Sequence, residues 1–240
     1  MSLIGKRVVV IGGTSGIGLA TARAFLSSSA SVIIGSRSSA KISEAIRALP
    51  GPVDAHPVDF RMDNELERFF AAVGAFDHLV VTAGQAAMGP FDTLPMDQAL
   101  AAFDSKFWGQ YRTLKAALPY LNPQSSVTFT SGVYALHPPK GGFVLAAINS
   151  GLEGLVRGLA VELAPIRVNA VSPGIVDTPI YAGLSEQDRQ ALWQDLAQRL
   201  PVGHVGTAEA LAECYVFLAQ NDFSTGTVLL ADGGAHLGSA

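Results

Sequence analysis

Short apolar runs recur along the chain and alternate with longer segments whose apolar residues fall on one helical face. The runs occupy about residues 7–12, 31–35, 53–58, 76–82, 127–130, 167–171 and 227–230. Runs of this length that are rich in Val and Ile are typical of strands buried on both faces of a parallel sheet.

The segments between these runs have the spacing of helices. They cover about residues 17–28, 39–49, 63–73, 97–120, 143–163, 185–199 and 207–219. In the second segment Ile42, Ala45, Ile46 and Leu49 share one face, and Asp63 is suited to cap the third. This alternation predicts an α/β fold: a Rossmann-like, doubly wound parallel sheet of about seven strands, flanked by helices and joined by right-handed crossovers.

Composition limits the class of protein. The chain has 240 residues, 49% hydrophobic and 15% charged, with a net charge of −4. We expect one domain over residues 1–240, and no nucleic-acid partner, since Lys and Arg are scattered. The first residues lead straight into a strand without a signal peptide, and no apolar run is long enough to span a bilayer. The expectation is a cytoplasmic protein without a membrane partner.

Cysteine and histidine usage indicates neither a disulfide nor a metal site. Cys214 is the single cysteine and lies in an apolar helical stretch, which favours a core role. The five histidines are scattered without ligand spacing, so we expect no bound metal.

A glycine-rich turn over residues 12–18, here called the glycine turn, follows the first strand and opens the first helix. Gly12 permits a sharp turn, Gly16 lets a phosphate approach the backbone, and Gly18 lets the helix lie close to the strand. The free N–H groups and positive dipole end of the helix favour a pyrophosphate. We expect the dinucleotide to contact Gly12, Thr14, Ser15, Gly16, Ile17 and Gly18.

Several further segments resemble the short-chain dehydrogenase/reductase family over nearly the whole chain. They are Asp59-Phe60, Ala83-Gly84, Leu152-Glu153-Gly154-Leu155, the stretch from Ile166 to Gly174, and Ala231-Asp232-Gly233-Gly234. The resemblance implies the Rossmann-like fold, a nicotinamide cofactor and oxidoreductase activity on a small molecule.

The residues after the second strand favour NADP(H) over NAD(H). An acidic residue at this position binds the ribose hydroxyls of NAD, but this chain has Ser36 followed by Arg37. A hydroxyl and a guanidinium suit the 2′-phosphate of NADP, and Ser38 and Lys41 are placed to add to the pocket. The alternative is that Arg37 stacks on the adenine or faces solvent.

The resemblance also implies the remaining cofactor contacts. Asp59 would accept from the adenine amino group, and Phe60 would flank the ring. Ala83 and Gly84 would lie along the adenine-side ribose. The nicotinamide end would be held by Pro173, Gly174, Ile175 and Thr178.

The catalytic segment departs from the family. The family uses a tyrosine as general acid or base and, one helical turn later, a lysine that binds the ribose and lowers the tyrosine pKa. The Leu152 to Leu155 motif places these two positions at Leu145 and Asn149. Ser131 matches the family serine that polarises the substrate oxygen, although a serine here can simply bond the local backbone.

The family's asparagine in the long helix before the fifth strand corresponds to Lys106. Lysine and asparagine are therefore exchanged between the two long helices. We hypothesise that Lys106 returns an ammonium group to the nicotinamide-ribose region, while Asn149 keeps a hydrogen bond to the ribose. The alternative is that Lys106 reaches solvent or pairs with Asp104 or another carboxylate.

The missing proton donor has two candidate replacements. Tyr134 follows Ser131 in the loop that borders the substrate in the family, and Tyr181 lies at the start of the substrate lid, about residues 178–203. Packing is the alternative role for both tyrosines, and His137 is interpreted as an exposed loop residue.

The sequence thus predicts an atypical NADP(H)-dependent oxidoreductase acting on a small carbonyl or alcohol with an apolar part. One alternative is an NADP(H)-binding sensor or scaffold without turnover. Another is non-redox chemistry on a carbonyl compound with the nucleotide bound. Small residues in the two long helices fit the close packing of the family's homodimers and homotetramers, although a plain core role also explains them.

Overall fold

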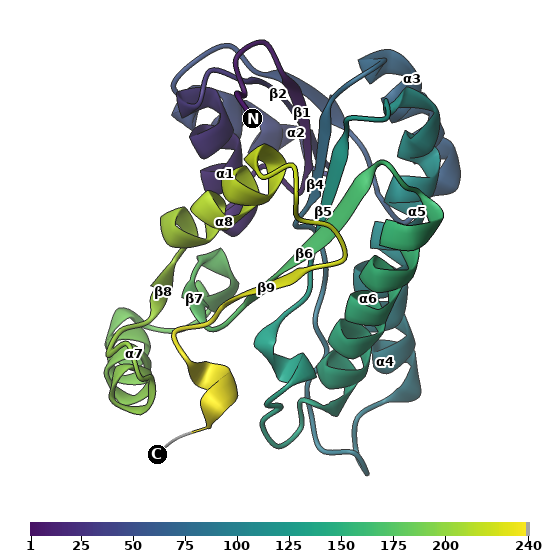
Figure 1. Cartoon of the computed structure of the whole chain (residues 1–240). Coiled ribbons are helices and arrows are strands. Elements are labelled where there is room, and N and C mark those ends of the chain that lie inside the picture. Colours follow the sequence, from purple (N-terminus) through teal and green to yellow (C-terminus); the bar gives the residue numbers. More distant parts are fainter. Residues whose placement is uncertain (239–240) are drawn as a thin grey trace.

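The computed structural model describes residues 1–238 and has seven parallel strands in one sheet between two layers of helices (Figure 1). The strands are β1 (Arg7–Ile11), β2 (Ser31–Ser36), β3 (Asp54–Pro57), β4 (His78–Val81), β5 (Ser126–Thr130), β6 (Arg167–Pro173) and β9 (Val228–Ala231). Their order across the sheet is β3-β2-β1-β4-β5-β6-β9. The winding direction reverses between β1 and β4, which confirms the predicted doubly wound, Rossmann-like topology.

The helices cover both faces of this sheet. They are α1 (Gly16–Ser27), α2 (Ser39–Ala48), α3 (Asp63–Val73), α4 (Met96–Ala102), α5 (Gly109–Ala117), α6 (Phe143–Glu162), α7 (Glu186–Arg199) and α8 (Ala208–Gln220). Helices α1, α2 and α8 pack on one face, and α3, α5 and α6 pack on the other. Two-residue strands β7 (Val176–Asp177) and β8 (Gly206–Thr207), which the sequence pattern did not predict, pair on either side of α7.

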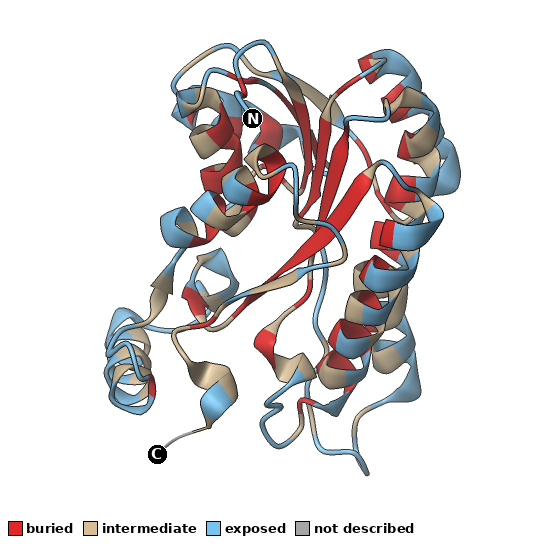
Figure 2. Cartoon of the chain, viewed as in Figure 1, coloured by how far each residue is buried: buried red, intermediate tan, exposed pale blue. Residues whose placement is uncertain are grey.

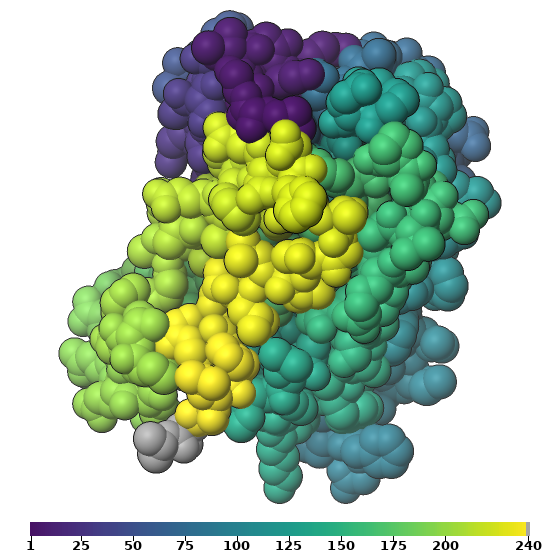
Figure 3. All heavy atoms as spheres, in the orientation of Figure 1, coloured from purple at the N-terminus to yellow at the C-terminus, as the bar shows by residue number. Residues whose placement is uncertain are grey.

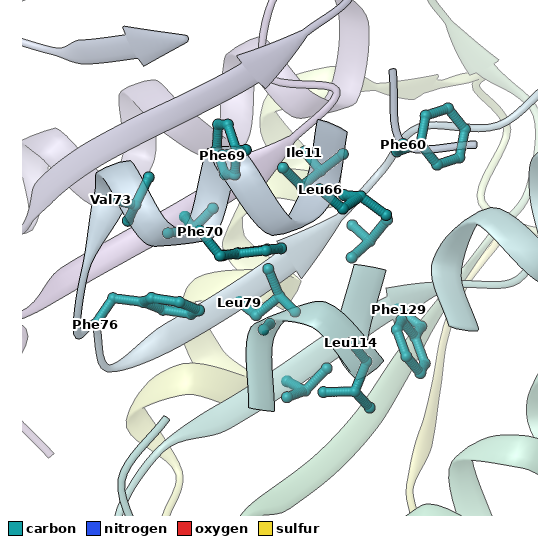
Figure 4. Packing of buried hydrophobic residues seen from close by; sticks show 14 of the residues in the cluster. Ile11, Phe60, Leu66, Phe69, Phe70, Val73, Phe76, Leu79, Leu114 and Phe129 are labelled. Carbon is teal, nitrogen blue, oxygen red and sulfur yellow. The ribbon is translucent and has the colours of Figure 1, made fainter. Parts of the chain in front are cut away.

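The central strands are buried on both faces, as their continuous apolar runs predict (Figure 2). On the α3 side, Phe69, Phe70 and Phe76 gather around Leu79 and Leu114 (Figure 4). Phe69 and Phe70 meet edge to face with ring centroids 5.1 Å apart. In Figure 3 the C-terminal segment, in yellow, runs down the face in view between α7 and α6, and its strand β9 is the last strand of the sheet.

Helix α6 is one of these packed helices. It has 20 residues and a window with a mean hydropathy of 1.3, so by length and composition alone it is long and apolar enough to cross a membrane. The expectation that no such run exists is therefore wrong by this measure. Its Ile148, Leu152 and Val156 are fully buried within the protein, which accounts for the apolar composition.

The single helix expected over 97–120 is also wrong in detail. Between α4 and α5 the chain forms a π-helical turn, η1 (Phe103–Trp108), and α5 ends in a 3-10 turn, η2 (Leu118–Tyr120). Further 3-10 turns are η3 (Val133–Ala135), η4 (Pro179–Tyr181) and η5 (Ala235–Leu237). The spacing of apolar residues is too similar in α- and π-helices for the sequence to reveal a single π turn. The π turn nevertheless changes the direction of the side chains within it.

Close packing of α1 against β1 explains the glycine at position 18. A Cβ atom there would lie 2.1 Å from the Gly12 carbonyl oxygen and 2.5 Å from Thr82 Oγ1. Gly12 has φ of +93°, which a residue with a side chain rarely adopts. These two positions bring the start of α1, the end of β1 and the loop after β4 into direct contact.

The Gly18→Ala variant should therefore lose about 1–3 kcal/mol of stability, because α1 must move away from β1. We expect the melting temperature to fall by roughly 2–10 °C. Gly158→Ala is the matched control, since a Cβ at this exposed position of α6 meets nothing within 4 Å. That variant should gain about 0.5–1 kcal/mol from helix propensity. Equal melting temperatures for the two variants would contradict this account.

Candidate functional site

One cavity of about 600 Å³ opens at the carboxyl ends of the strands, beside the point where the winding reverses. Most of the predicted site residues line it. They are Gly12, Thr14, Ser15, Gly16, Ile17, Gly18, Ser36, Arg37, Ser38, Phe60, Ala83, Gly84, Lys106, Ser131, Tyr134, Asn149, Pro173, Gly174, Ile175 and Thr178. The fold therefore brings together segments that are widely separated in the sequence.

The glycine turn forms one part of the cavity wall. Helix α1 begins there with Ser15 as its N-cap residue, but the Ser15 side chain makes no capping hydrogen bond. The first turn of α1 also carries no acidic residue. The positive end of this helix thus faces the cavity without a protein anion, an arrangement that suits a phosphate.

The end of β2 supplies the next part of the wall. The hydroxyl groups of Ser36 and Thr14 are hydrogen-bonded at 3.0 Å, which links β2 to the glycine turn. The side chains of Arg37 and Lys41 lie at the exposed edge of the cavity. The end of β2 carries no carboxylate. A phosphate group of a ligand bound there would face hydroxyl groups and cations.

Asp59 is the predicted cofactor residue that does not line the cavity. Arg61 holds its carboxylate through hydrogen bonds from Nε at 3.0 Å and from a terminal guanidinium nitrogen at 2.6 Å. This hydrogen bonding lowers the pKa of Asp59 despite the opposing effect of burial. The adjacent Phe60 does lie in the wall. An adenine contact from Asp59 remains a prediction, and no sequence pattern indicated the Arg61 partner.

The opposite end of the cavity carries Leu145 and Asn149 on neighbouring turns of α6. Both side chains are buried. Asn149 Nδ2 donates to the Gly132 carbonyl at 3.1 Å, whereas Asn149 Oδ1 is buried without a hydrogen-bond partner. Leu145 presents only carbon atoms. The two α6 residues in this wall therefore provide neither a proton-donating acid nor a charged group.

Ser131 lines the same end, but its hydroxyl is committed to α6. It donates to Glu153 Oε1 at 2.9 Å and lies 3.3 Å from the Asn149 carbonyl oxygen. A role for Ser131 in polarising a substrate thus remains a prediction. Glu153 appeared in the sequence only as part of a family motif, and its spacing gave no sign that it would bind this serine.

Lys106 lies in the π turn and crosses the cavity wall toward β5. Its Nζ donates to the Ser131 carbonyl oxygen at 3.0 Å. Asp104 does not pair with it, because Arg112 binds Asp104 Oδ1 at 2.7 Å. Burial lowers the pKa of Lys106 to about 8. Lys106 therefore lines the site with its Nζ held at the Ser131 carbonyl, and no carboxylate within residues 1–238 forms an ion pair with it.

Gln110 fixes the backbone around this lysine. Its amide donates to the Lys106 carbonyl at 2.9 Å and to the Thr130 carbonyl at 3.1 Å, while Thr130 N donates to its Oε1 at 3.0 Å. One fully buried side chain thus ties the π turn to the end of β5. Sequence reasoning missed Gln110; its position one helical turn after Lys106 was the available signal.

Both candidate tyrosines line the cavity, Tyr134 from η3 and Tyr181 from η4. Tyr181 packs edge to face on Trp193 of α7, with ring centroids 4.8 Å apart. Burial raises the pKa of both phenols, so both remain protonated and weakly acidic at neutral pH. Within residues 1–238, no group of three or more His, Cys, Asp or Glu residues is arranged to hold a metal ion.

Known proteins resemble this chain over nearly its full length. A family model described as enoyl-(acyl carrier protein) reductase matches residues 12–236. The short-chain dehydrogenase/reductase fsr5 of Gibberella fujikuroi is 35% identical and covers 98% of this chain and 96% of its own. The short-chain dehydrogenase/reductase ATR9 of Stachybotrys chlorohalonatus is 33% identical and covers 97% and 98%, respectively.

Two solved structures give the same result. A small-chain dehydrogenase in complex with NADPH has a TM-score of 0.85 at 38% identity and covers 98% of this chain and 100% of its own. MalC Reductase/Diels-Alderase from Malbranchea aurantiaca has a TM-score of 0.90 at 29% identity and covers 98% of both chains.

The lowered pKa of Lys106 has a consequence for stability. The buried charge destabilises the folded state fully below a pH of about 8, and the penalty fades as the pH rises toward the ordinary value of 10.5. Removing the charge in the Lys106→Met variant should therefore increase the stability of the folded state most at neutral pH. We expect the melting temperature of the variant, relative to wild type, to fall by a few degrees between about pH 7 and pH 10.

Lys115→Met is the control for this measurement, since Lys115 is an exposed lysine on α5. Its melting temperature should differ from wild type by a constant amount across the same pH range. A constant difference for Lys106→Met as well would show that the lysine has an ordinary pKa.

Proposed function

The chain belongs to the short-chain dehydrogenase/reductase family, and on this premise we propose that it is an NADP(H)-dependent oxidoreductase acting on a small carbonyl or alcohol substrate. The observation that carries this proposal is the continuous cavity, which joins the glycine turn to a wall containing Lys106, Tyr134 and Asn149. Binding a dinucleotide and placing a reactive group at its far end require this connection.

The residues of the glycine turn fit a pyrophosphate. Gly16, with φ of +50°, lines the cavity without a side chain, and the uncapped start of α1 faces the same space. Ser36 and Arg37 are placed to contact the adenine-side ribose of a bound dinucleotide. No carboxylate at the end of β2 would repel the 2′-phosphate on that ribose. These features favour NADP(H), the cofactor form bound to the small-chain dehydrogenase that this chain resembles.

A bound nicotinamide supplies the hydride chemistry. The chain's own residues orient the two reactants: Pro173 and Thr178 border one side of the cavity, and Asn149 borders the other. Asn149 Oδ1, buried without a partner, is available to accept a hydrogen bond from a ribose hydroxyl. Leu145, Val133 and Ile180 give the substrate region an apolar wall, which suits a substrate with an apolar part.

Leu145 also supports a second candidate function. A leucine cannot exchange a proton, so the usual family chemistry has lost its acid at this position. The neighbouring structure from Malbranchea aurantiaca is described as both a reductase and a Diels-Alderase. Non-redox chemistry on a carbonyl compound, with the nucleotide bound, is therefore the alternative to reduction.

We also propose that the chain assembles into homodimers or homotetramers. Trp108 and Tyr111, at the π turn and on α5, expose large parts of their rings. Phe223, after α8, is 98% exposed. Apolar groups of this size on a monomer surface are suited to burial in an interface.

Cofactor choice can be tested with Arg37→Ala. Loss of a charged contact to the 2′-phosphate should weaken NADPH binding by about 10-fold to 100-fold and leave NADH binding unchanged. Titration of intrinsic fluorescence with each nucleotide measures both affinities. Arg47→Ala, at an exposed arginine of α2 outside the cavity, should leave both unchanged. Equal weakening of NADPH and NADH in Arg37→Ala would contradict phosphate recognition.

Turnover is tested by incubating the protein with NADPH and a panel of carbonyl compounds, while following NADPH oxidation and product mass. Reduction should consume NADPH and add two hydrogen atoms to the product. A product of unchanged mass, formed without NADPH oxidation, would favour the non-redox candidate. Nucleotide binding with no product from any compound would favour a sensor or scaffold.

A further inference from the structure

Three cations line the cavity among the described residues, and they lie in two separate regions. Arg37 and Lys41 belong to the segment after β2, beside the glycine turn. Lys106 comes from the π turn and reaches the end of β5, near Asn149 and Tyr134. Only Lys106 therefore combines a positive charge and transferable protons at the end of the cavity where the substrate region lies.

Several contacts fix the course of this side chain. Gln110 holds the Lys106 carbonyl, and the Ser131 carbonyl accepts one Nζ proton. Gly84 makes room for the stem, since a Cβ there would lie 3.1 Å from Lys106 Cγ. One proton of the ammonium is thus used in holding its position, and the other two remain available to groups in the cavity.

The tyrosines are less suitable proton donors. In the family pattern a neighbouring lysine lowers the pKa of the tyrosine, but Asn149 occupies that position here. Burial instead raises the pKa of Tyr134 and of Tyr181. Within residues 1–238, neither hydroxyl group forms a hydrogen bond to a cation that would offset this change.

The charged and titratable groups on the surrounding elements, within residues 1–238, form no hydrogen bond or ion pair with the Lys106 ammonium. They are Asp104 in its own turn, Asp97 on α4, Arg112 and Lys115 on α5, Glu153 and Arg157 on α6, and Tyr134 on η3. Asp104 pairs with Arg112, and Glu153 accepts from Ser131. Protonation of Lys106 is accordingly governed by its burial and by what enters the cavity.

We propose that Lys106 is the catalytic proton donor, which gives its Nζ proton to the substrate oxygen in place of the family's tyrosine, with Gln110 as its positioning residue. This inference rests on the proposed function and names the acid that completes it. In the reductive direction, a bound dihydronicotinamide would supply the hydride that forms the new C–H bond at the carbonyl carbon. The C=O π pair moves to oxygen, which takes a proton from Lys106.

The remaining steps balance charge. The carbonyl is reduced to an alcohol, the dihydronicotinamide is oxidised, and Lys106 becomes a neutral amine that solvent in the open cavity reprotonates. A donor with a pKa near the working pH both gives up and regains its proton readily. In the oxidative direction the neutral amine accepts the proton from the alcohol.

The proposal is tested with Lys106→Met and Lys106→Arg, each compared with wild type for NADPH binding, kcat and pH profile. Both variants should bind NADPH with an affinity close to wild type and lose about 10²–10⁴-fold in kcat. Arginine keeps the charge but does not release its proton, so it separates proton donation from charge alone. In wild type, reduction should decline above a pH of about 8 and oxidation should increase.

Two further variants complete the comparison. Lys115→Met should leave kcat unchanged, whereas Tyr134→Phe should lower kcat far less than either Lys106 variant does. Wild-type kcat in both Lys106 variants would overturn the proposal, while NADPH-dependent reduction itself would still stand. Full activity in Lys106→Arg alone would assign the lysine a purely electrostatic role and would also overturn it. Absence of reduction by wild type on every carbonyl tested would reject the proposed function and this inference together.

A second readout does not require turnover. Acetylation of Lys106, followed by mass spectrometry across pH with Lys115 as the internal reference, reports when the amine loses its proton. The midpoint should lie near 8 for Lys106, and NADP⁺ should slow the reaction. A midpoint at the ordinary lysine value of 10.5 would contradict the proposal.

Discussion

The contact between the start of α1, the end of β1 and the loop after β4 determines where the site forms. Gly18 and Gly12 approach so closely that a single Cβ at position 18 would lie 2.1 Å from the Gly12 carbonyl oxygen. Thr82 adds a hydrogen bond from Oγ1 to the Ile11 carbonyl at 3.2 Å. Because the crossovers on either side of this contact run in opposite directions, the cavity opens beside it.

The far end of the cavity depends on side-chain interactions of a different kind. Gln110 ties the π turn to β5, and this arrangement brings Lys106 to the Ser131 carbonyl. Helix α6, which provides tyrosine and lysine in the family pattern, here provides Leu145 and Asn149. Separate parts of the fold therefore bind the cofactor and supply the proton. The residues that supply the proton can change while the cofactor site is kept.

The regular parts of the fold followed from the sequence because burial imposes a pattern. Strands β1 and β4 are apolar after their first residue, and β5 and β6 interleave apolar residues with polar ones, most of which are buried as well. The glycine turn was also predictable, since close backbone approach requires glycine at particular positions. The substitutions at Leu145 and Asn149 could be located because the Leu152 to Leu155 motif lies on the same helix and fixes their positions.

Other features depend on geometry that the pattern does not encode. The π turn at Lys106 changes the helix by one residue, which apolar periodicity does not register. The binding of Asp59 by Arg61 and of Ser131 by Glu153 depends on side-chain directions, and in the second case on the packing of α6 against β5. Sequence alone therefore indicated which residues surround the site, and the structure shows which groups remain free to act.

The central claim is that this chain supplies its proton from the π turn and not from α6. A crystal structure of the ternary complex with NADP⁺ and an alcohol product tests it most directly. The claim predicts Lys106 Nζ within about 3 Å of the product oxygen while it still contacts the Ser131 carbonyl. A product oxygen bonded to Tyr134 or Tyr181, with Lys106 Nζ out of hydrogen-bonding reach, would contradict it.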